Sequence, residues 1–238
     1  MNIAGIALTG ALLLSFSGVV SSFVRPSLPR VAAVETALVE KKKPRVLVID
    51  PGHGGGDGGA VAPDGTTEKD IDLAVAKDID ALSLLFGIPA VMTRTEDELL
   101  SDRYPGETGG MKARDLKGRL RVAKEADAAL LLSIHANKFP DESVRGIQVF
   151  YSPNGDESRR AAGMIQEYVN ANLQPDHVKE TKRANSSIYL LDRAKVPAVL
   201  AECGFLSNGA ELAALKTEEY RASVACAVFA AAAEYLSN

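Results

Sequence analysis

Two of the three histidines in this 238-residue chain, and one glutamate, closely follow apolar runs of strand length. The runs and the residues they lead to are Val46–Asp50 with His53, Leu130–Ile134 with His135, and Val199–Ala201 with Glu202. Short apolar runs of this kind are typical of buried strands. Because the carboxyl ends of parallel strands form the ligand crevice of an α/β sheet, we expect the three side chains to meet at one edge.

Imidazole and carboxylate groups together are ligands that zinc accepts, and catalytic zinc sites combine three protein ligands with a water. Either histidine alone is more often a structural residue, but two at strand ends, each followed by small residues, favour a metal site. Glu68 is the candidate third ligand, since it lies at the start of a predicted helix, across a Gly-rich loop from His53. Its alternative role is a carboxylate stabilised by the positive end of the helix dipole.

The Gly-rich loop at residues 52–59 has a second interpretation as a phosphate cradle, because it follows a strand and precedes a helix. The match is poor: the helix begins only after Pro63, and no Gly-Lys-Ser/Thr follows. The better interpretation is backbone freedom that lets His53 reach inward.

Strand-like and helical patterns alternate along the chain after residue 44. The predicted strands are 45–50, 88–93, 128–134, 146–152, 188–191 and 198–202, and the predicted helices are 67–85, 111–126, 158–173 and 218–236. This alternation predicts a single α/β domain with a mostly parallel, twisted central sheet and helices on both faces.

The composition is that of an ordinary globular protein, with 46% hydrophobic and 24% charged residues. The net charge of −4 and the lack of a basic block in the folded region argue against nucleic acid as a partner. The two cysteines form no disulfide framework and no CxxC pair. Cys203 follows Glu202 on a predicted strand, so it points the other way and is expected in the core.

The N-terminal segment has a different character. Residues 2–24 carry no charge and 8–20 are mostly apolar, which is typical of a signal peptide or an uncleaved membrane anchor. We therefore expect residues 1–24 to contact the membrane during export or as an anchor, 25–44 to be a linker, and 45–238 to be an extracytoplasmic catalytic domain. Whether the leader is cleaved stays open, because positive charges follow the apolar run instead of preceding it.

Five segments resemble the zinc-dependent N-acetylmuramoyl-L-alanine amidases, the family-3 amidases of bacterial peptidoglycan metabolism. They are IDPGHGGGDGGA (49–60), EKDIDLAVAKDI (68–79), MTRTED (92–97), LLSIHAN (131–137) and AECGFLSN (201–208). The resemblance spans about residues 45–236, with the motifs in the family's order. It implies peptidoglycan as partner, Zn²⁺ held by His53, Glu68 and His135, and Glu202 as the catalytic residue.

The reaction implied by the resemblance is hydrolysis of the amide between N-acetylmuramic acid and L-alanine of the stem peptide. Bound zinc polarises a carbonyl and lowers the pKa of water, and Glu202 is expected to act as general base and then to protonate the departing nitrogen. The short leader and the long loop 95–119 also resemble the spore-cortex, germination-specific branch, which acts on the way to muramic-δ-lactam.

Polar residues near the predicted strand ends are candidates for binding the stem peptide. They are Arg94, Asn137, Arg183 and Asn208. Guanidinium groups match carboxylates with paired hydrogen bonds, while asparagines either orient carbonyls or simply form turns. Asp50 is expected to accept a hydrogen bond that steadies the ligand shell around His53.

Three other functions remain possible at this stage. A zinc peptidase that acts on peptide alone would need the same metal and base. A non-catalytic wall-binding or scaffold domain would carry a decayed site, although all four site residues are present. A nucleotide-binding protein would use the Gly-rich loop. The sequence names no protein activator.

Overall fold

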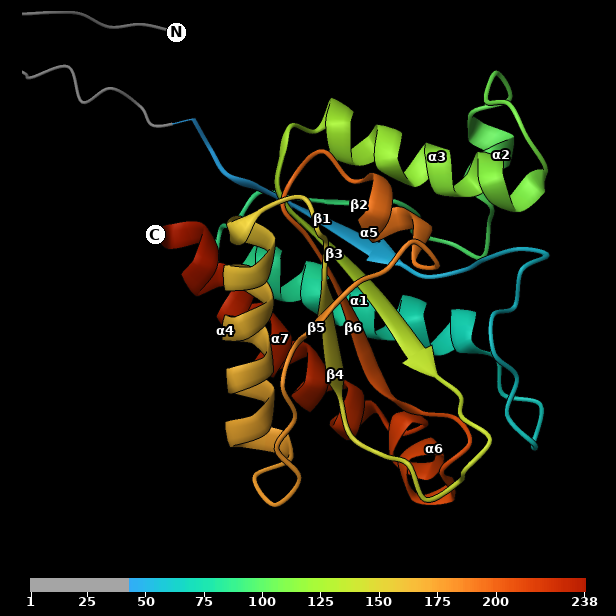
Figure 1. Cartoon of the computed structure of the whole chain (residues 1–238), viewed down its shortest axis with the longest axis vertical. Helices are drawn as coiled ribbons and strands as arrows, with labels where there is room; N and C mark the ends of the chain where they lie inside the picture. The colour runs from blue at the N-terminus through green and yellow to red at the C-terminus, as the bar shows by residue number, and fades with distance from the viewer. Residues whose placement is uncertain (1–42) are drawn as a thin grey trace, which may run out of the picture. The chain divides into compact units, whose positions relative to one another are not determined.

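A six-stranded sheet forms the centre of this computed structural model, which describes residues 43–238 (Figure 1). The strands are β1 (Val46–Pro51), β2 (Ala90–Met92), β3 (Ala128–Asn137), β4 (Gln148–Tyr151), β5 (Lys182–Arg183) and β6 (Ala198–Phe205). Their spatial order is β2-β1-β3-β6-β4-β5, and every neighbouring pair is parallel except β4 with β6. The predicted mostly parallel α/β sheet is therefore confirmed.

Helices cover both faces of the sheet (Figure 1). They are α1 (Glu68–Leu85), α2 (Leu100–Arg103), α3 (Met111–Glu125), α4 (Asp156–Leu173), α5 (Tyr189–Arg193), α6 (Gly209–Leu215) and α7 (Glu218–Ser237). Alternate residues of β1 pack into two separate cores: Leu47 and Ile49 face the α1, α4 and α7 side, and Val48 faces the α3 and α5 side. This alternation explains why the central strands read as continuous apolar runs.

The leader predicted for residues 1–24, and most of the linker predicted for 25–44, lie outside the described residues. Among the helices of residues 43–238, none has the length and apolar character needed to span a membrane.

The strand predicted at 188–191 is wrong. The segment instead leads into helix α5, where Leu190 and Leu191 are buried in the core beneath α3. A short apolar run suits one buried helical turn as well as a strand, and periodicity cannot distinguish them at this length. The edge of the sheet is taken by the two-residue strand β5, which no apolar pattern marks.

Arg119 of α3 fixes the loop that follows β1. Its buried guanidinium donates to Asp50 at 2.8 Å, to Asp115 at 2.7 Å and to the backbone carbonyl of Pro51 at 2.5 Å, and also to the carbonyl of His53. Burial opposes ionisation of Asp50, but Arg119, Ser133 and Thr93 outweigh it and hold the pKa of Asp50 below its usual value. The loop carrying His53 is thus held by a fully buried charge network.

Replacing this guanidinium should be costly. Arg119→Met leaves the Asp50 and Asp115 carboxylates buried without their cation, so we expect a loss of about 3–5 kcal/mol in the free energy of unfolding. Urea denaturation measures it. Arg121→Met is the matched control on the same helix, because Arg121 pairs with Glu125 at the surface and should cost about 0–1 kcal/mol. Equal losses in the two variants would contradict the central role of Arg119.

Candidate metal centre

The ends of three strands bring His53, His135 and Glu202 to one edge of the sheet. His135 and Glu202 are register partners on β3 and β6, so their side chains leave the sheet on the same face. His53 lies just past the end of β1, in the loop that Arg119 holds. The first residue of α1, Glu68, closes the group from a fourth segment.

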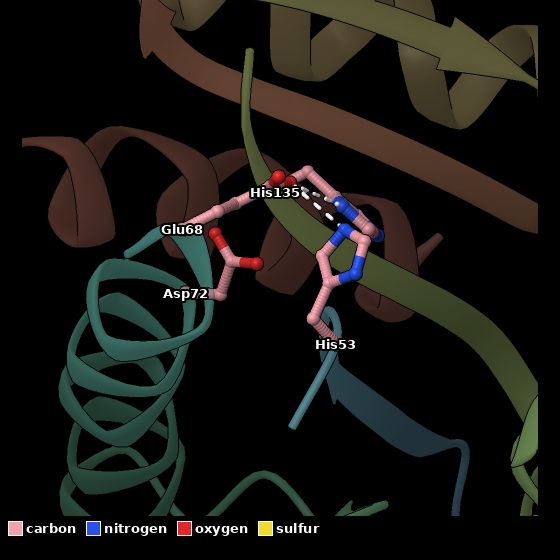
Figure 2. A group of neighbouring side chains, drawn as sticks. All are labelled: His53, Glu68, Asp72 and His135. Carbon is pink, nitrogen blue, oxygen red and sulfur yellow. Dashed lines mark hydrogen bonds and ion pairs between the residues drawn. The ribbon is translucent and has the colours of Figure 1, made fainter. Parts of the chain in front are cut away.

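Both imidazole rings converge on one carboxylate oxygen, Oε1 of Glu68 (Figure 2). His135 Nδ1 lies 2.8 Å from it and His53 Nε2 lies 3.2 Å from it. The rings meet edge to face, with centroids 5.1 Å apart. Potential ligand atoms of His53, Glu68, Asp72 and His135 all lie within 4.8 Å of one another. Two imidazole nitrogens and a carboxylate form a donor set suited to a divalent metal.

The backbone of His53 adopts a φ of 53°, in the left-handed region that non-glycine residues rarely occupy. Two interactions hold it there: the Arg119 hydrogen bond to its carbonyl, and paired backbone hydrogen bonds between Gly54 and Asp57 at 2.9 Å. Asp57 Oδ2 also lies 3.0 Å from His53 Nδ1 and can orient the ring. Such a sparsely populated conformation, held from several sides, is common at functional sites.

The pKa values of the two glutamates at the site are shifted in opposite directions. Burial opposes ionisation of Glu68, but hydrogen bonds and charges from His135 and His53 outweigh it and hold its pKa far below the usual range. Burial raises the pKa of Glu202 to about 7, and the charge of Glu68 adds to this effect. Burial lowers the proton affinity of His53, yet Glu68 and Asp57 reverse this and raise its pKa. Glu202 is thus the carboxylate with a proton affinity near neutrality, which suits a general base.

Asp72 was not among the residues predicted from the sequence. It lies one turn after Glu68 on the same face of α1, and its side chain is fully buried. Neither of its oxygens has a hydrogen-bond donor among the described residues. The signal available in the sequence was the spacing of two carboxylates at i and i+4 in the first turns of a helix.

A cavity of about 230 Å³ adjoins the group on the side of α3 and α5. It is lined by His53, His135 and Glu202 and, across from them, by Lys112, Ser187 and Tyr189. The His53 and His135 side chains keep 16% and 18% of their surface exposed. A substrate can therefore reach both imidazoles from this cavity.

Two of the predicted substrate-binding residues have structural roles instead. Arg94 is buried, with 1% of its surface exposed, and its guanidinium donates only to backbone carbonyls, including Gly52 at 2.6 Å and Lys69 at 2.9 Å. It ties the His53 loop to α1 and is not available to a ligand. Asn208 caps α6, accepting from the backbone of Ala210 and Glu211. Asn208 follows Glu202 by six residues because α6 begins directly after it.

Asp50 lies at the end of β1 and accepts three side-chain hydrogen bonds. Its oxygens accept from Arg119, Thr93 and Ser133, and no hydrogen bond joins it to the His53 side chain. Arg119 links it to His53, because the same guanidinium donates to the backbone carbonyl of that histidine. Asn137 lies at the end of β3 and accepts from the backbone of Lys138, and Arg183 is exposed on β5.

Proteins of known activity are similar to this chain over most of its length. Residues 47–234 match the family model for N-acetylmuramoyl-L-alanine amidase. The germination-specific N-acetylmuramoyl-L-alanine amidase of Bacillus subtilis is 34% identical over 197 residues, which cover 82% of this chain and 81% of that protein.

Solved structures agree with this match. The CwlD amidase of Clostridioides difficile, determined in complex with the GerS lipoprotein, has a TM-score of 0.75 at 33% identity, covering 81% of this chain and 98% of that one. The amidase AmiC2 of Nostoc punctiforme has a TM-score of 0.68 at 29% identity, covering 82% and 98%. The chain therefore belongs to the N-acetylmuramoyl-L-alanine amidases, metal-dependent hydrolases of peptidoglycan.

Proposed function

We propose that this amidase works with a zinc ion held by His53, Glu68 and His135, and with Glu202 as general base. The observation that carries the proposal is the convergence of both imidazoles on one Glu68 oxygen, beside a carboxylate whose pKa is raised to about 7. The bond to be cleaved is the amide between N-acetylmuramic acid and L-alanine of the stem peptide.

Two glycines shape the space around the proposed ligands. A Cβ at Gly52 would lie 2.6 Å from His135 Nδ1, and one at Gly59 would lie 2.5 Å from Glu68 Oε2 and 2.6 Å from the His53 ring. The absence of side chains at these positions lets the three donors approach one another. A divalent ion requires neutral imidazoles and an ionised carboxylate as ligands, and the low pKa of Glu68 meets the second of these requirements. The residues present therefore fit zinc.

Zinc, when bound, would favour hydrolysis in two ways: it would polarise the carbonyl oxygen of the amide and lower the pKa of water. Glu202 then has the two proton-transfer tasks. Its Oε2 is buried and has no hydrogen-bond donor among residues 43–238, so it is free to accept a proton from the attacking water. The same oxygen can return that proton to the nitrogen of L-alanine as the amide bond breaks. Asp57 keeps His53 oriented during both steps through its contact with Nδ1.

For the stem peptide we propose contacts from Asn137 and Arg183, the two predicted substrate-binding residues whose side chains remain partly or largely exposed. Lys112 is a further candidate, because it lines the cavity beside His53 with a largely exposed ammonium group. The cationic side chains of Arg183 and Lys112 would complement the carboxylates of the peptide, and the Asn137 amide could hydrogen-bond to its carbonyl groups.

The relatives support a proposal for the biological setting of this protein. Cell-wall amidases act outside the cytoplasm, and the germination-specific relative supports a role in the spore cortex. We further propose that residues 1–24 direct export or anchor the chain. A lipoprotein is a proposed partner, because the similar amidase of Clostridioides difficile forms a complex with the GerS lipoprotein.

The role of Glu202 is tested by Glu202→Gln. The amide has the shape of the carboxylate but cannot accept the proton, so we expect normal zinc content and a ~10²–10⁴-fold fall in kcat on muropeptides. Elemental analysis and chromatography of released stem peptide measure the two quantities. His135→Ala is the comparison, since it should lose both metal and activity. Turnover within a few-fold of wild type would remove Glu202 from this role.

The steric requirement at Gly52 gives a second test. Gly52→Ala places a methyl group against His135 and Asp72, so the imidazole must move and we expect less bound zinc per chain. Gly58→Ala is the control in the same loop, where a Cβ meets nothing closer than 3.9 Å. Equal zinc content in the two variants would contradict the proposed ligand geometry.

The substrate is tested by comparing a muropeptide with the free stem peptide. We expect release of stem peptide from the muropeptide, abolished by a chelator and restored by zinc, and no cleavage within the free peptide. Mass spectrometry identifies the new amino terminus at L-alanine. Cleavage of the free peptide at a similar rate would instead favour a zinc peptidase.

A further inference from the structure

Asp72 is a buried carboxyl group that accepts no hydrogen bond from the described residues. Its relative exposure is 0%, and neither Oδ1 nor Oδ2 has a donor within residues 43–238. An ionised group in this position is strongly unfavourable unless a cation or hydrogen-bond donors stabilise it. The native fold therefore retains a group that its protein neighbours alone do not satisfy.

The charged groups around Asp72 make its ionised form still less favourable. The carboxylates of Glu68 and Glu202 act on it with like charge. The positive charges of Arg94 and Arg119 favour the ionised form. Their guanidiniums, however, donate hydrogen bonds to other acceptors: Arg94 to backbone carbonyls, and Arg119 to Asp50, Asp115 and the carbonyl of Pro51.

The position of Asp72 points to what compensates it. One of its oxygens lies within 4.8 Å of the facing donor atoms of His53, Glu68 and His135. Figure 2 shows its carboxylate on the same side of α1 as Glu68, beside the two imidazole rings. The glycine at position 52 makes this approach possible, because a Cβ there would lie 2.7 Å from Asp72 Oδ2 and 2.6 Å from His135 Nδ1.

We infer that Asp72 is a second carboxylate of the metal centre, beside Glu68, and that it raises the affinity of the centre for a divalent cation above that of the two histidines and Glu68 alone. The inference rests on the proposed zinc site. Affinity for hard and borderline divalent ions rises with the number of charged oxygen ligands around them. An ion at this centre would place a positive charge beside the Asp72 carboxylate, to which no described donor hydrogen-bonds. Asp72 is assigned no proton transfer, which remains with Glu202.

The experiment is a zinc titration of the full-length protein in competition with a chromophoric chelator. Asp72→Asn keeps the shape of the side chain and removes its charge, so the zinc Kd should rise by ~10–100-fold. Asp80→Asn is the matched control, on the same helix but outside the metal centre, and should leave the Kd unchanged. Thermal melting of the metal-free proteins checks folding: Asp72→Asn should melt no lower than wild type, since an amide of the same shape replaces a buried carboxyl group that makes no hydrogen bond within residues 43–238.

The outcomes separate this inference from the proposed function. Tight zinc binding by wild type with a Kd within twofold for Asp72→Asn would overturn the role of Asp72 alone. A wild-type protein that binds no zinc would overturn the zinc site and this inference together. If Asp72→Asn lowers the melting temperature of the metal-free protein and leaves the Kd unchanged, Asp72 is a purely structural residue.

Discussion

The burial of Arg119 is the interaction on which the rest of the site depends. This one guanidinium neutralises Asp50 at the end of β1, pairs with Asp115 on its own helix, and holds the carbonyl of His53. Because Arg119, Asp50 and Asp115 are all buried, solvent does not screen their charges. Removing any one of them would leave an uncompensated buried charge. The left-handed backbone conformation of His53 is therefore held by Arg119, which the packing of α3 against the sheet keeps in place.

The shared direction of the parallel strands places the other residues of the centre next to this loop. Parallel β1, β3 and β6 all end at one edge, so three segments far apart in sequence deliver His53, His135 and Glu202 to the same place. Helix α1 then begins at that edge and contributes Glu68 with its first residue. The two glutamates differ because of their local surroundings. Glu68 accepts from two imidazoles, which lowers its pKa, while burial and the charge of Glu68 raise the pKa of Glu202 to about 7.

Much of this was readable from the sequence, and the failures have physical causes. The apolar runs before His135 and Glu202 identified central strands because those strands are buried on both faces. Arg94 was misjudged because an arginine after a strand looks the same whether it faces solvent or binds carbonyls beneath a loop. Asp72 was missed for a similar reason, since its burial depends on how α1 packs against the sheet. Helix α5 was mistaken for a strand, because four apolar or aromatic residues fit either conformation.

The reversed direction of β4 has a consequence for how the family can diversify. β3 ends at Asn137 and β4 begins at Gln148, opposite Glu202, so both ends of the connection 138–147 lie at the catalytic edge. Segments inserted there would emerge beside the metal ligands without disturbing any strand pairing, since surface connections accept added length at little cost to stability. This short connection is accordingly one position where the chain could gain length next to the catalytic edge while the metal ligands stay fixed.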